Sequence, residues 1–267
     1  MSLKTALRKS APLLYDRMAY EWHFVRALRQ LRRGKVPAAA VAEFAENFPG
    51  KLPKECPVCG FTGHFRAFGS PPRYNAMCPS CGALERHRLI ALAIRNKALS
   101  RPGITILHFA PEASVRSLLD KPGVNYRTAD LSSASVDLNL NIESIALPDE
   151  SVDVIVCNHV LEHVDDRRAL PQLRRILKQD GTLIATVPIV DGCETTYEDP
   201  AITTASGREA HFGQWDHVRV YGSDFAKRLT EAGLRFETYT AYGAEAVRHA
   251  LLPGEKVFLC RKGAPRA

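Results

Sequence analysis

Apolar segments of strand length alternate with segments of helix length from residue 104 onward, and this alternation constrains the fold more than any other feature. The pattern predicts strands at 104–109, 125–129, 152–157 and 182–187, with helices at 112–119 and 160–177. Helices are also predicted at 85–99 and 223–232, and closing strands at 236–241 and 256–260. Strands that alternate with helices at this spacing form a parallel sheet covered on both faces, so the sequence predicts an α/β fold.

A second feature is the cysteine spacing before this region. Cys56, Cys59, Cys78 and Cys81 form a C-x2-C-x18-C-x2-C pattern, and each pair is followed by a glycine. This spacing is typical of four-cysteine zinc ribbons, in which four thiolates complete a tetrahedron and the ion is structural. The alternative is two disulfides, which a cytosolic compartment disfavours. Residues 54–84 are otherwise expected to be irregular.

The positive charge is concentrated at the amino terminus. Residues 1–36 contain nine Lys/Arg and two Asp/Glu, whereas the remaining 27 basic and 27 acidic residues balance. Apolar residues recur at helical spacing in this arm, at Leu14, Met18, Trp22, Val25 and Leu28. A basic amphipathic helix can dock on its own domain, contact a membrane surface or touch RNA, and the sequence leaves these three interpretations open. The breaker cluster Phe48-Pro49-Gly50 predicts a boundary near residue 50.

No segment has the length of a membrane span. The longest apolar run is about six residues, Leu89 to Ile94, and charged residues interrupt the first 20 positions. We therefore expect a cytoplasmic protein.

An acidic residue follows the second predicted strand. Asp130 lies 22 residues after His108, near the end of the first strand. In open parallel sheets, ligands bind at the carboxyl ends of strands, and an acid at about this distance can accept hydrogen bonds from a ribose diol. The pattern therefore indicates a nucleotide cofactor, with strand capping by Asp130 as the alternative.

Two longer motifs narrow the cofactor class. Residues 151–164 contain His-Val-Leu-Glu-His-Val, and residues 173–188 contain Leu-Lys-Gln-Asp-Gly-Thr-Leu. Both closely resemble the class I S-adenosylmethionine-dependent methyltransferases. With residues 78–88, 107–112 and 212–222 included, the chain resembles a zinc-ribbon-containing branch of that family.

The resemblance implies a fold and a domain organisation. The fold would be a Rossmann-like, doubly wound, mostly parallel seven-stranded sheet with an amino-terminal helical arm and a small zinc ribbon. The expected domains are the basic arm at 1–50, the ribbon at 51–84 and the methyltransferase domain at 85–267.

The resemblance also implies cofactor-binding residues. The turn after the first strand would lie along the methionine part of S-adenosylmethionine, Asp130 and Leu131 would be at the ribose, Asn141 and Ile142 would flank the adenine, and Asn158 and His159 would lie beneath the sulfonium. That turn comprises His108, Phe109, Ala110, Pro111 and Glu112. It departs from the family pattern because it has no glycine, so the backbone must approach the cofactor in another way. Glu162 and His163 are interpreted as supporting or helix-surface residues.

His217 and His159 are the candidate catalytic bases, because a histidine can accept the proton of a hydroxyl acceptor near neutral pH. Asp216 is expected to orient His217, and Arg219 to bind an anionic group. Tyr197 and Trp215 complete the candidate substrate residues, which lie on a segment from 190 to 220 with the length of a lid.

Three functions follow as expectations. The first is O-methylation of a small molecule or glycan. The second is RNA methylation, which the positive charge of the arm favours and the neutral charge of the remaining chain disfavours. The third is a non-catalytic cofactor-binding module, suggested by the missing glycines.

Overall fold

The computed structural model describes residues 53–69, 73–95, 97 and 99–263, together with Met18, Trp22, Val25, Arg26 and Arg29 of the arm. The backbone is helical at these five arm positions. Leu14, Leu28 and the predicted boundary near residue 50 lie outside the described residues.

The chain divides into two compact units. The ribbon unit comprises Met1–Arg88 and Gly243–Leu251, and the sheet unit comprises Leu89–Tyr242 and Leu252–Ala267. The predicted domain bounds at 50 and 84 stay predictions. The structure adds that a short segment near the carboxyl end, 243–251, clusters with the ribbon.

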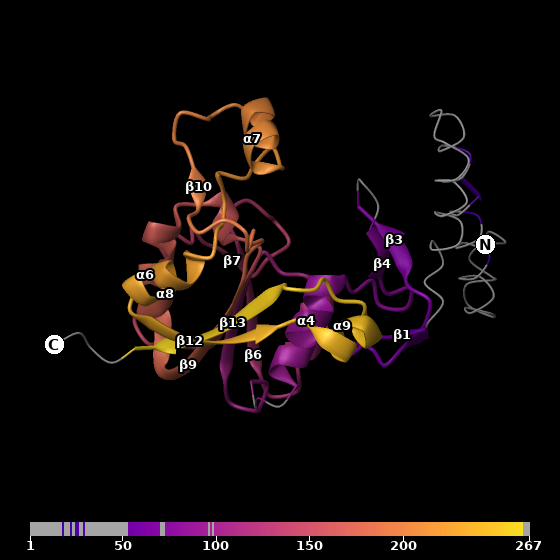
Figure 1. Cartoon of the computed structure of the whole chain (residues 1–267). Helices are drawn as coiled ribbons and strands as arrows, with labels where there is room; N and C mark the ends of the chain where they lie inside the picture. Colours follow the sequence, from indigo (N-terminus) through magenta and orange to yellow (C-terminus); the bar gives the residue numbers. More distant parts are fainter. Residues whose placement is uncertain are drawn as a thin grey trace. The chain divides into compact units, whose positions relative to one another are not determined.

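The sheet unit contains a seven-stranded sheet in the order β12-β13-β9-β8-β5-β6-β7 (Figure 1). Its strands are β5 (Thr105–Phe109), β6 (Asn125–Asp130), β7 (Leu138–Asn139), β8 (Val152–Asn158), β9 (Leu177–Thr186), β12 (Leu234–Thr240) and β13 (Lys256–Lys262). Only β13 runs antiparallel to its neighbours, β9 and β12. This mostly parallel, seven-stranded sheet is the predicted Rossmann-like arrangement.

The central strands are apolar because both of their faces are buried. In β8, six of the seven residues are buried, as expected for a parallel strand covered on each side. Leu107 and Phe109 of β5 belong to the main core cluster, together with Ile155 and Cys157 of β8. The apolar side chains of the central strands therefore point into the core, and the polar side chains lie at the strand ends.

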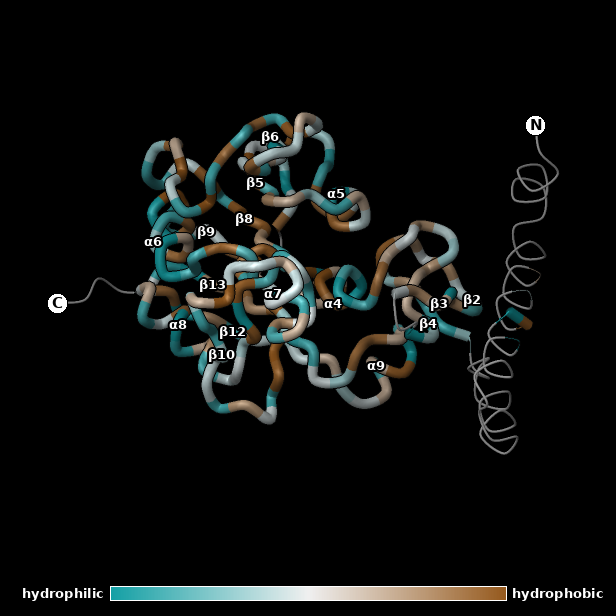
Figure 2. Tube along the Cα trace, turned by 90° about the horizontal axis from the view of Figure 1, so that it is seen from above, coloured by the Kyte–Doolittle hydropathy of each residue, from teal (hydrophilic) through white to brown (hydrophobic). Residues whose placement is uncertain are grey.

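Helices α5 (Ala113–Leu119), α6 (Asp166–Ile176), α7 (Ala205–Phe212) and α8 (Phe225–Glu231) complete the sheet unit. The hydrophilic colour dominates much of α6 in Figure 2, whereas Ala169, Leu170, Leu173 and Ile176 form its buried face. This one-sided pattern is that of a helix packed on a sheet.

The prediction of one helix over 160–177 was wrong. Residues Leu161–His163 form a 3-10 turn, η1, and α6 begins only at Asp166. Val164 is extended, and the Asp165 side chain accepts a hydrogen bond from the backbone N–H of Arg167 at 3.0 Å, which caps α6. This N-cap starts a new helix, because it satisfies a donor that a continuous helix would have used internally.

The long segment from 190 to 220 is not irregular throughout. It contains β10 (Tyr197–Glu198), α7 and β11 (Arg219–Val220), and β10 and β11 pair as a small antiparallel ladder. Figure 1 shows α7 and β10 beyond the sheet layer. The segment is therefore a folded insertion of the sheet unit.

The ribbon unit also has more regular structure than the sequence predicted. It contains β1 (Lys54–Glu55), β2 (Thr62–Gly63), β3 (Arg66–Phe68), β4 (Arg73–Met77) and α9 (Gly243–His249), and α4 (Glu85–Ile94) begins in it. Strands β1 and β2 pair with each other, as do β3 and β4. The expectation that residues 54–84 are irregular was therefore wrong, because short hairpins satisfy backbone groups in each half of the ribbon.

A buried arginine joins the parts of the ribbon unit. Arg88 has no exposed surface, and its guanidinium donates to the carbonyl oxygens of Ala76 and Ala83 at 2.8 and 2.7 Å and of His249 at 2.7 Å. The guanidinium carbon also lies 4.6 Å from the centroid of the Phe65 ring. A guanidinium with several fixed donors can hold separate loops at once, so Arg88 ties α9 to the second cysteine knuckle.

Among the described residues, no helix is long and apolar enough to span a membrane.

Candidate functional site

The carboxyl ends of three neighbouring strands bring polar side chains together. Asn158, at the end of β8, donates from Nδ2 to Glu112 Oε2, and its Oδ1 accepts from the hydroxyl of Thr186 at the end of β9. Asn158 is only 3% exposed. This chain of hydrogen bonds fixes both ends of the amide, so Glu112 and Asn158 meet at the predicted cofactor edge. Thr186 was not identified from the sequence, because a threonine ending a strand carries no distinctive signal.

The turn after β5 replaces the missing glycine by a left-handed alanine. Ala110 is exposed and has φ 47°, and its N–H donates to Ala129 O at 2.9 Å. Pro111 follows, and Glu112 precedes the first residue of α5. Ala110 thus adopts a conformation that glycine normally supplies, at the steric cost of its Cβ atom.

One carboxylate oxygen of Asp130 accepts hydrogen bonds from its own loop, and the other accepts none among the described residues. Its Oδ1 accepts from the N–H groups of Ser132 and Ser133, each at 2.9 Å, so this carboxylate does cap its own loop. No hydrogen bond reaches Oδ2 within the described part of the chain. Leu131 beside it is 67% exposed. Capping and ribose binding therefore do not exclude each other at Asp130.

Of the two residues predicted to flank the adenine, Asn141 is exposed and Ile142 is buried. Asn141 is exposed, and its Oδ1 accepts from the Glu143 N–H at 2.9 Å. Ile142 is 4% exposed and belongs to the main core. The Asn141 oxygen keeps one acceptor site, and its amide nitrogen makes no hydrogen bond among the described residues.

The side chains of His108 and Phe109 do not reach the strand edge. Phe109 is part of the core, and His108 is fully buried with its Nδ1 2.6 Å from the Tyr126 hydroxyl. Burial raises the pKa of Tyr126, so this hydroxyl stays protonated. These two residues lie beneath the turn, and its exposed part begins at Ala110.

Three histidines and one glutamate form a cluster. His159, Glu162 and His163 directly follow β8 in the sequence, and His217 precedes β11. His159 has a left-handed backbone, with φ 52°, and its Nδ1 lies 3.1 Å from Glu162 Oε1. The His163 and His217 rings meet edge to face, with centroids 4.7 Å apart. Glu162 is fully buried in η1, so the helix-surface interpretation of this residue was wrong, whereas a supporting role for Glu162 and His163 stays a prediction. The H-x-x-E-H spacing was the available signal, because a tight turn after a strand places these side chains together.

The backbone around the cluster is well anchored. Val218 N–H donates to Glu162 O at 2.9 Å, which joins the segment carrying His217 to η1. The Tyr221 hydroxyl and Arg219 Nη1 both donate to Leu161 O, at 3.1 and 2.8 Å. These contacts hold two segments that are more than 50 residues apart in one place.

His217 is partly buried. Burial lowers its pKa, and the positive charge of a protonated His163 would act in the same direction, whereas Glu162 opposes both effects. Its Nδ1 lies 3.3 Å from the Phe212 carbonyl oxygen. This contact leaves Nε2 as the nitrogen that faces away from the backbone.

Asp216 does not orient His217 as predicted. Its Oδ2 lies 3.3 Å from His163 Nδ1, and its Oδ1 accepts from Gln214 at 2.7 Å. Asp216 therefore pairs with the other histidine of the cluster, because the turn at 213–217 directs it toward η1. Trp215 is 62% exposed on the same turn.

Arg219 is not available to bind an anionic acceptor, contrary to the prediction. It is 7% exposed, donates to Glu198 at 2.9 Å and contacts Asp166, Leu161 O and Val164 O. Its charge and donors are thus used within the protein. Tyr197 is 45% exposed, with its hydroxyl 2.6 Å from His211 Nδ1.

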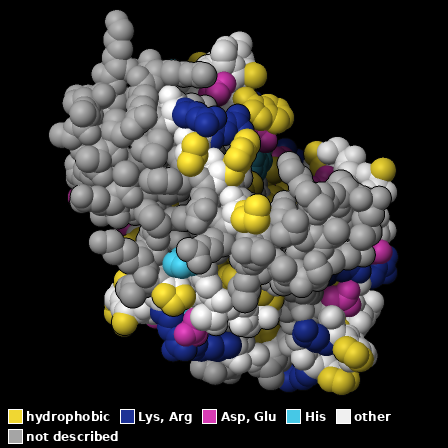
Figure 3. Space-filling view, turned by 90° about the vertical axis from the view of Figure 1, so that its right-hand side faces the viewer, with side chains coloured by type: hydrophobic (Ala, Val, Ile, Leu, Met, Phe, Trp, Pro, Cys, Tyr) yellow, Lys and Arg dark blue, Asp and Glu magenta, His cyan; other side chains and the backbone are white. Residues whose placement is uncertain are grey.

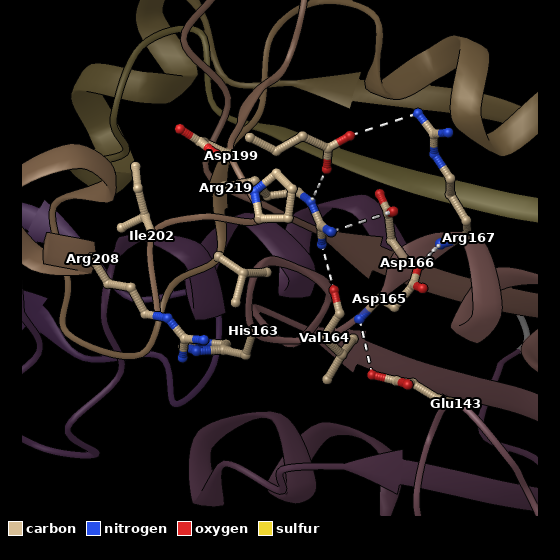
Figure 4. Close-up of a pocket in the computed structure, with 13 residues that line it drawn as sticks. Glu143, His163, Val164, Asp165, Asp166, Arg167, Asp199, Ile202, Arg208 and Arg219 are labelled. Atoms are coloured by element: carbon tan, nitrogen blue, oxygen red, sulfur yellow. Dashed lines mark hydrogen bonds and ion pairs between the residues drawn. The ribbon is translucent and has the colours of Figure 1, made fainter. Parts of the chain in front are cut away.

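A cavity of about 510 Å³ lies beside the histidine cluster. Figure 4 shows Arg208 of α7 pointing into this cavity, which His163 also lines. Arg208 Nε is buried and makes no hydrogen bond within the described residues. Arg208 is therefore a cation at this cavity whose Nε is not used within the described residues.

The four cysteines of the ribbon unit come together. Cys56 and Cys81 have sulfurs 3.7 Å apart, as do Cys59 and Cys78, and all four sulfurs lie within 4.8 Å of one another. A tetrahedron with metal–sulfur bonds of about 2.3 Å has edges of roughly 3.8 Å, so the cluster has the dimensions of a zinc site. Burial, reinforced by the neighbouring sulfurs, raises the pKa of Cys81 to about 12, and a bound cation would reverse this effect.

Comparison with known proteins identifies a methyltransferase domain within the sheet unit. Residues 108–185 match the model of a family described as a methyltransferase domain. The chain is 23% identical over 205 residues to a Mycobacterium tuberculosis protein named "Probable S-adenosylmethionine-dependent methyltransferase", covering 66% of this chain and 71% of that protein. A match of 45% identity over 47 residues, to an uncharacterized protein of Methanocaldococcus jannaschii, covers 18% of this chain and 21% of that protein.

Two solved structures are similar at lower identity. The 1,6-didemethyltoxoflavin-N1-methyltransferase of Burkholderia thailandensis, solved with 1,6-didemethyltoxoflavin and S-adenosylhomocysteine, has 15% identity and a TM-score of 0.46, covering 66% of this chain and 76% of that chain. The YcgJ protein of Bacillus subtilis has 17% identity and a TM-score of 0.42, covering 65% and 95%.

A mostly parallel sheet with polar side chains gathered at its carboxyl edge is the arrangement in which α/β enzymes bind nucleotide cofactors. The family match is more specific than this class. Residues 108–185 therefore form a methyltransferase domain, and the comparisons support a class I S-adenosylmethionine-dependent methyltransferase, which favours an enzyme over the non-catalytic module.

Proposed function

We propose that this enzyme methylates a hydroxyl oxygen of a small molecule or glycan. One observation carries the proposal. His159 Nδ1 faces the buried Glu162 carboxylate at 3.1 Å, while His159 Nε2 is buried and has no hydrogen-bond partner in the described chain. A carboxylate beside one ring nitrogen favours the tautomer with its proton on that nitrogen and leaves the other to accept a proton, which is the arrangement of a general base.

Residues of the strand edge would hold the cofactor. Asp130 Oδ2 is suited to the ribose hydroxyls, the turn from Ala110 to Glu112 to the methionine part, and Asn141 to the adenine edge. When bound, S-adenosylmethionine supplies the methyl group. The side chains of Glu112 and Asn158, linked by a hydrogen bond, are fixed before any ligand arrives, so they bind without losing rotamer entropy.

The acceptor would occupy the cavity bordered by His163, with Arg208 available for an anionic substituent and the exposed Tyr197 nearby on the insertion. Methyl transfer requires the acceptor oxygen in line with the methyl group, so positioning supplies much of the acceleration. His159 is preferred over His217 as the base, because only its free nitrogen is buried without a partner. His217 remains a candidate, with a ring nitrogen within 4.8 Å of a carboxylate oxygen of the same glutamate.

We further propose that the four cysteines hold one structural Zn²⁺. Their spacing in the sequence and their tetrahedral dimensions support this. The ion would stabilise a unit whose own core cluster includes only four fully buried residues among those described.

RNA methylation is the second candidate, and the basic arm is the observation that favours it. Residues after 36 carry no net charge. On the face shown in Figure 3, several described Lys and Arg side chains have Asp or Glu side chains beside them. A large RNA footprint needs a continuous basic surface, so the small-molecule or glycan acceptor is preferred.

Calorimetry with S-adenosylmethionine and turnover of His159→Ala test the main proposal. We expect the wild-type protein to bind the cofactor and to transfer labelled methyl groups to a small-molecule or glycan fraction of a cell extract. His159→Ala should lower turnover by about a hundredfold or more while leaving cofactor affinity within a factor of a few, since the imidazole acts on the acceptor.

The control is His64→Ala, which removes an exposed histidine of the ribbon unit. Failure of the wild-type protein to bind S-adenosylmethionine would refute the function. Unchanged turnover in His159→Ala would refute the base.

A further inference from the structure

Glu162, His163 and His217 converge from two segments of the sheet unit. One potential ligand atom from each lies within 4.8 Å of the others. Glu162 and His163 belong to η1, and His217 to the turn before β11. The hydrogen bond from Val218 N–H to Glu162 O fixes the distance between the two segments. The cluster is therefore built by the fold rather than by flexible surface side chains.

No hydrogen bond compensates for the burial of the Glu162 carboxylate within the described residues. It is fully buried, and neither oxygen accepts a hydrogen bond from any residue that the structure describes. Its ion-pair contact is with His159 at 3.1 Å, and the guanidinium of Arg219 is occupied by Glu198. A buried carboxylate without hydrogen bonds is costly unless a cation lies beside it.

The two histidines are held as metal ligands usually are. His163 Nδ1 lies 3.3 Å from the Asp216 carboxylate, and His217 Nδ1 lies 3.3 Å from the Phe212 carbonyl oxygen. Metal-binding histidines commonly donate their second ring N–H to a carboxylate or carbonyl, which fixes the tautomer. In both residues Nε2 is then the nitrogen left to bind an ion.

We propose that Glu162, His163 and His217 form a second metal site, which binds a divalent transition-metal ion such as Zn²⁺, Co²⁺ or Mn²⁺. Two imidazoles and one carboxylate suit these ions, and three protein ligands leave a coordination position open, as in catalytic rather than structural sites. This site differs from the ribbon cluster in its ligands, since it contains no sulfur.

The site lies next to the acceptor cavity, which His163 lines. An ion at this position would bind an acceptor hydroxyl and lower its pKa, so that less basicity is needed from the protein. This consequence rests on the proposed O-methylation, whereas the metal site itself does not. With the ion bound, His217 would act as a ligand, and His159 would remain the candidate base.

Cobalt titration of the full-length protein tests the site. Protein carrying one equivalent of Zn²⁺ is titrated with Co²⁺, and the visible d–d absorption is recorded. Co²⁺ is not expected to displace the zinc of the ribbon, because Zn²⁺ binds thiolates more tightly. We expect one equivalent of Co²⁺ to bind with d–d bands and without the intense charge-transfer bands that thiolate ligands produce.

Variants locate the binding. Glu162→Gln and His217→Ala should each weaken Co²⁺ binding by about tenfold or more. Glu209→Gln and His64→Ala, which change exposed residues of the same types, should leave the affinity unchanged. Circular dichroism checks folding, and His217→Ala keeps the test decisive if Glu162→Gln does not fold, because His217 is less buried.

Three outcomes would overturn the site: no d–d absorption at saturating Co²⁺, charge-transfer bands that place the ion on thiolates, or equal affinity in the ligand and control variants. Calorimetry with S-adenosylmethionine on the same preparation separates the two proposals. Cobalt binding without cofactor binding would retain the site and remove the methyltransfer function, and the reverse would remove only the site.

Discussion

At the scale of single residues, two positions that follow parallel strands adopt left-handed backbone conformations. Ala110 follows β5 and His159 follows β8, and neither is glycine. Such conformations cost roughly 1 to 2 kcal/mol for residues with a Cβ atom. Strain of this kind persists where the surrounding structure holds it, and it gathers at functional sites. Both residues lie at the carboxyl edge of the sheet, where the cofactor and acceptor are proposed to meet.

Asp130 provides a prediction at this scale. Asp130→Asn should weaken binding of S-adenosylmethionine by about tenfold to a hundredfold, because an ionised acceptor contributes roughly 1.5 to 3 kcal/mol to a hydrogen bond. The asparagine oxygen can still cap Ser132 and Ser133, so the loop should keep its structure. Isothermal titration calorimetry measures the change.

Asp120→Asn is the matched control, because Asp120 is a surface carboxylate paired with Arg116 on α5. Its affinity should equal that of the wild type. An unaltered dissociation constant in Asp130→Asn would show that the ribose is held elsewhere.

At the scale of elements, the ribbon unit depends on links between short pieces. Its strands have two to five residues, and Arg88 and the four cysteines connect them to one another and to α9. Elements this short do not form independently, so their stability comes from shared anchors. Loss of one anchor is expected to affect the whole unit.

Cys59→Ser tests this dependence. The variant should lose bound zinc, and the free energy of unfolding of the ribbon unit should fall by about 3 kcal/mol or more, because loss of a structural metal is among the most destabilising changes. Metal analysis and differential scanning calorimetry measure both effects. Cys193→Ser is the control, since Cys193 is also exposed and lies outside the cluster. Equal zinc content in the two variants would argue against the zinc ribbon.

At the scale of the whole molecule, charge separates the arm from the remainder. The excess positive charge of the chain lies within residues 1–36, and the rest is neutral. A basic arm can raise the rate of encounter with RNA or an anionic membrane without determining the chemistry at the site of the sheet unit. Docking of the arm on its own domain, membrane contact and RNA contact all stay predictions.

Replacing Arg26, Arg29, Arg32 and Arg33 together by Gln tests the role of the arm in acceptor choice. We expect methyl transfer to the small-molecule or glycan fraction to be unchanged. Any RNA binding by the wild type should weaken, and the slope of its salt dependence should fall by about 0.7 to 0.9 for each phosphate that the arm no longer neutralises. Filter binding at several salt concentrations gives the slope. Loss of methyl transfer in the variant, together with labelled RNA in the wild type, would favour RNA methylation.

The sequence by itself determined the class of fold and the family. Buried parallel strands need continuous apolar runs, and the His-Val-Leu-Glu-His-Val and four-cysteine motifs are local, so all three features are readable along the chain. The hairpins of the ribbon, the break between η1 and α6 and the ladder of β10 with β11 escaped prediction, because they depend on caps and on pairing between distant segments.

Only the tertiary structure decided which polar groups share a site. In the structure, Glu162 and His163 lie together with His217, and Asp216 pairs with His163. Arg219 is surrounded by carbonyl and carboxylate oxygens. The physical reason is that charged side chains are placed by the partners that packing brings to them. Glu198, the partner of Arg219, lies 21 residues from it along the chain. Val218, which donates to the η1 backbone at Glu162, lies 56 residues from that residue.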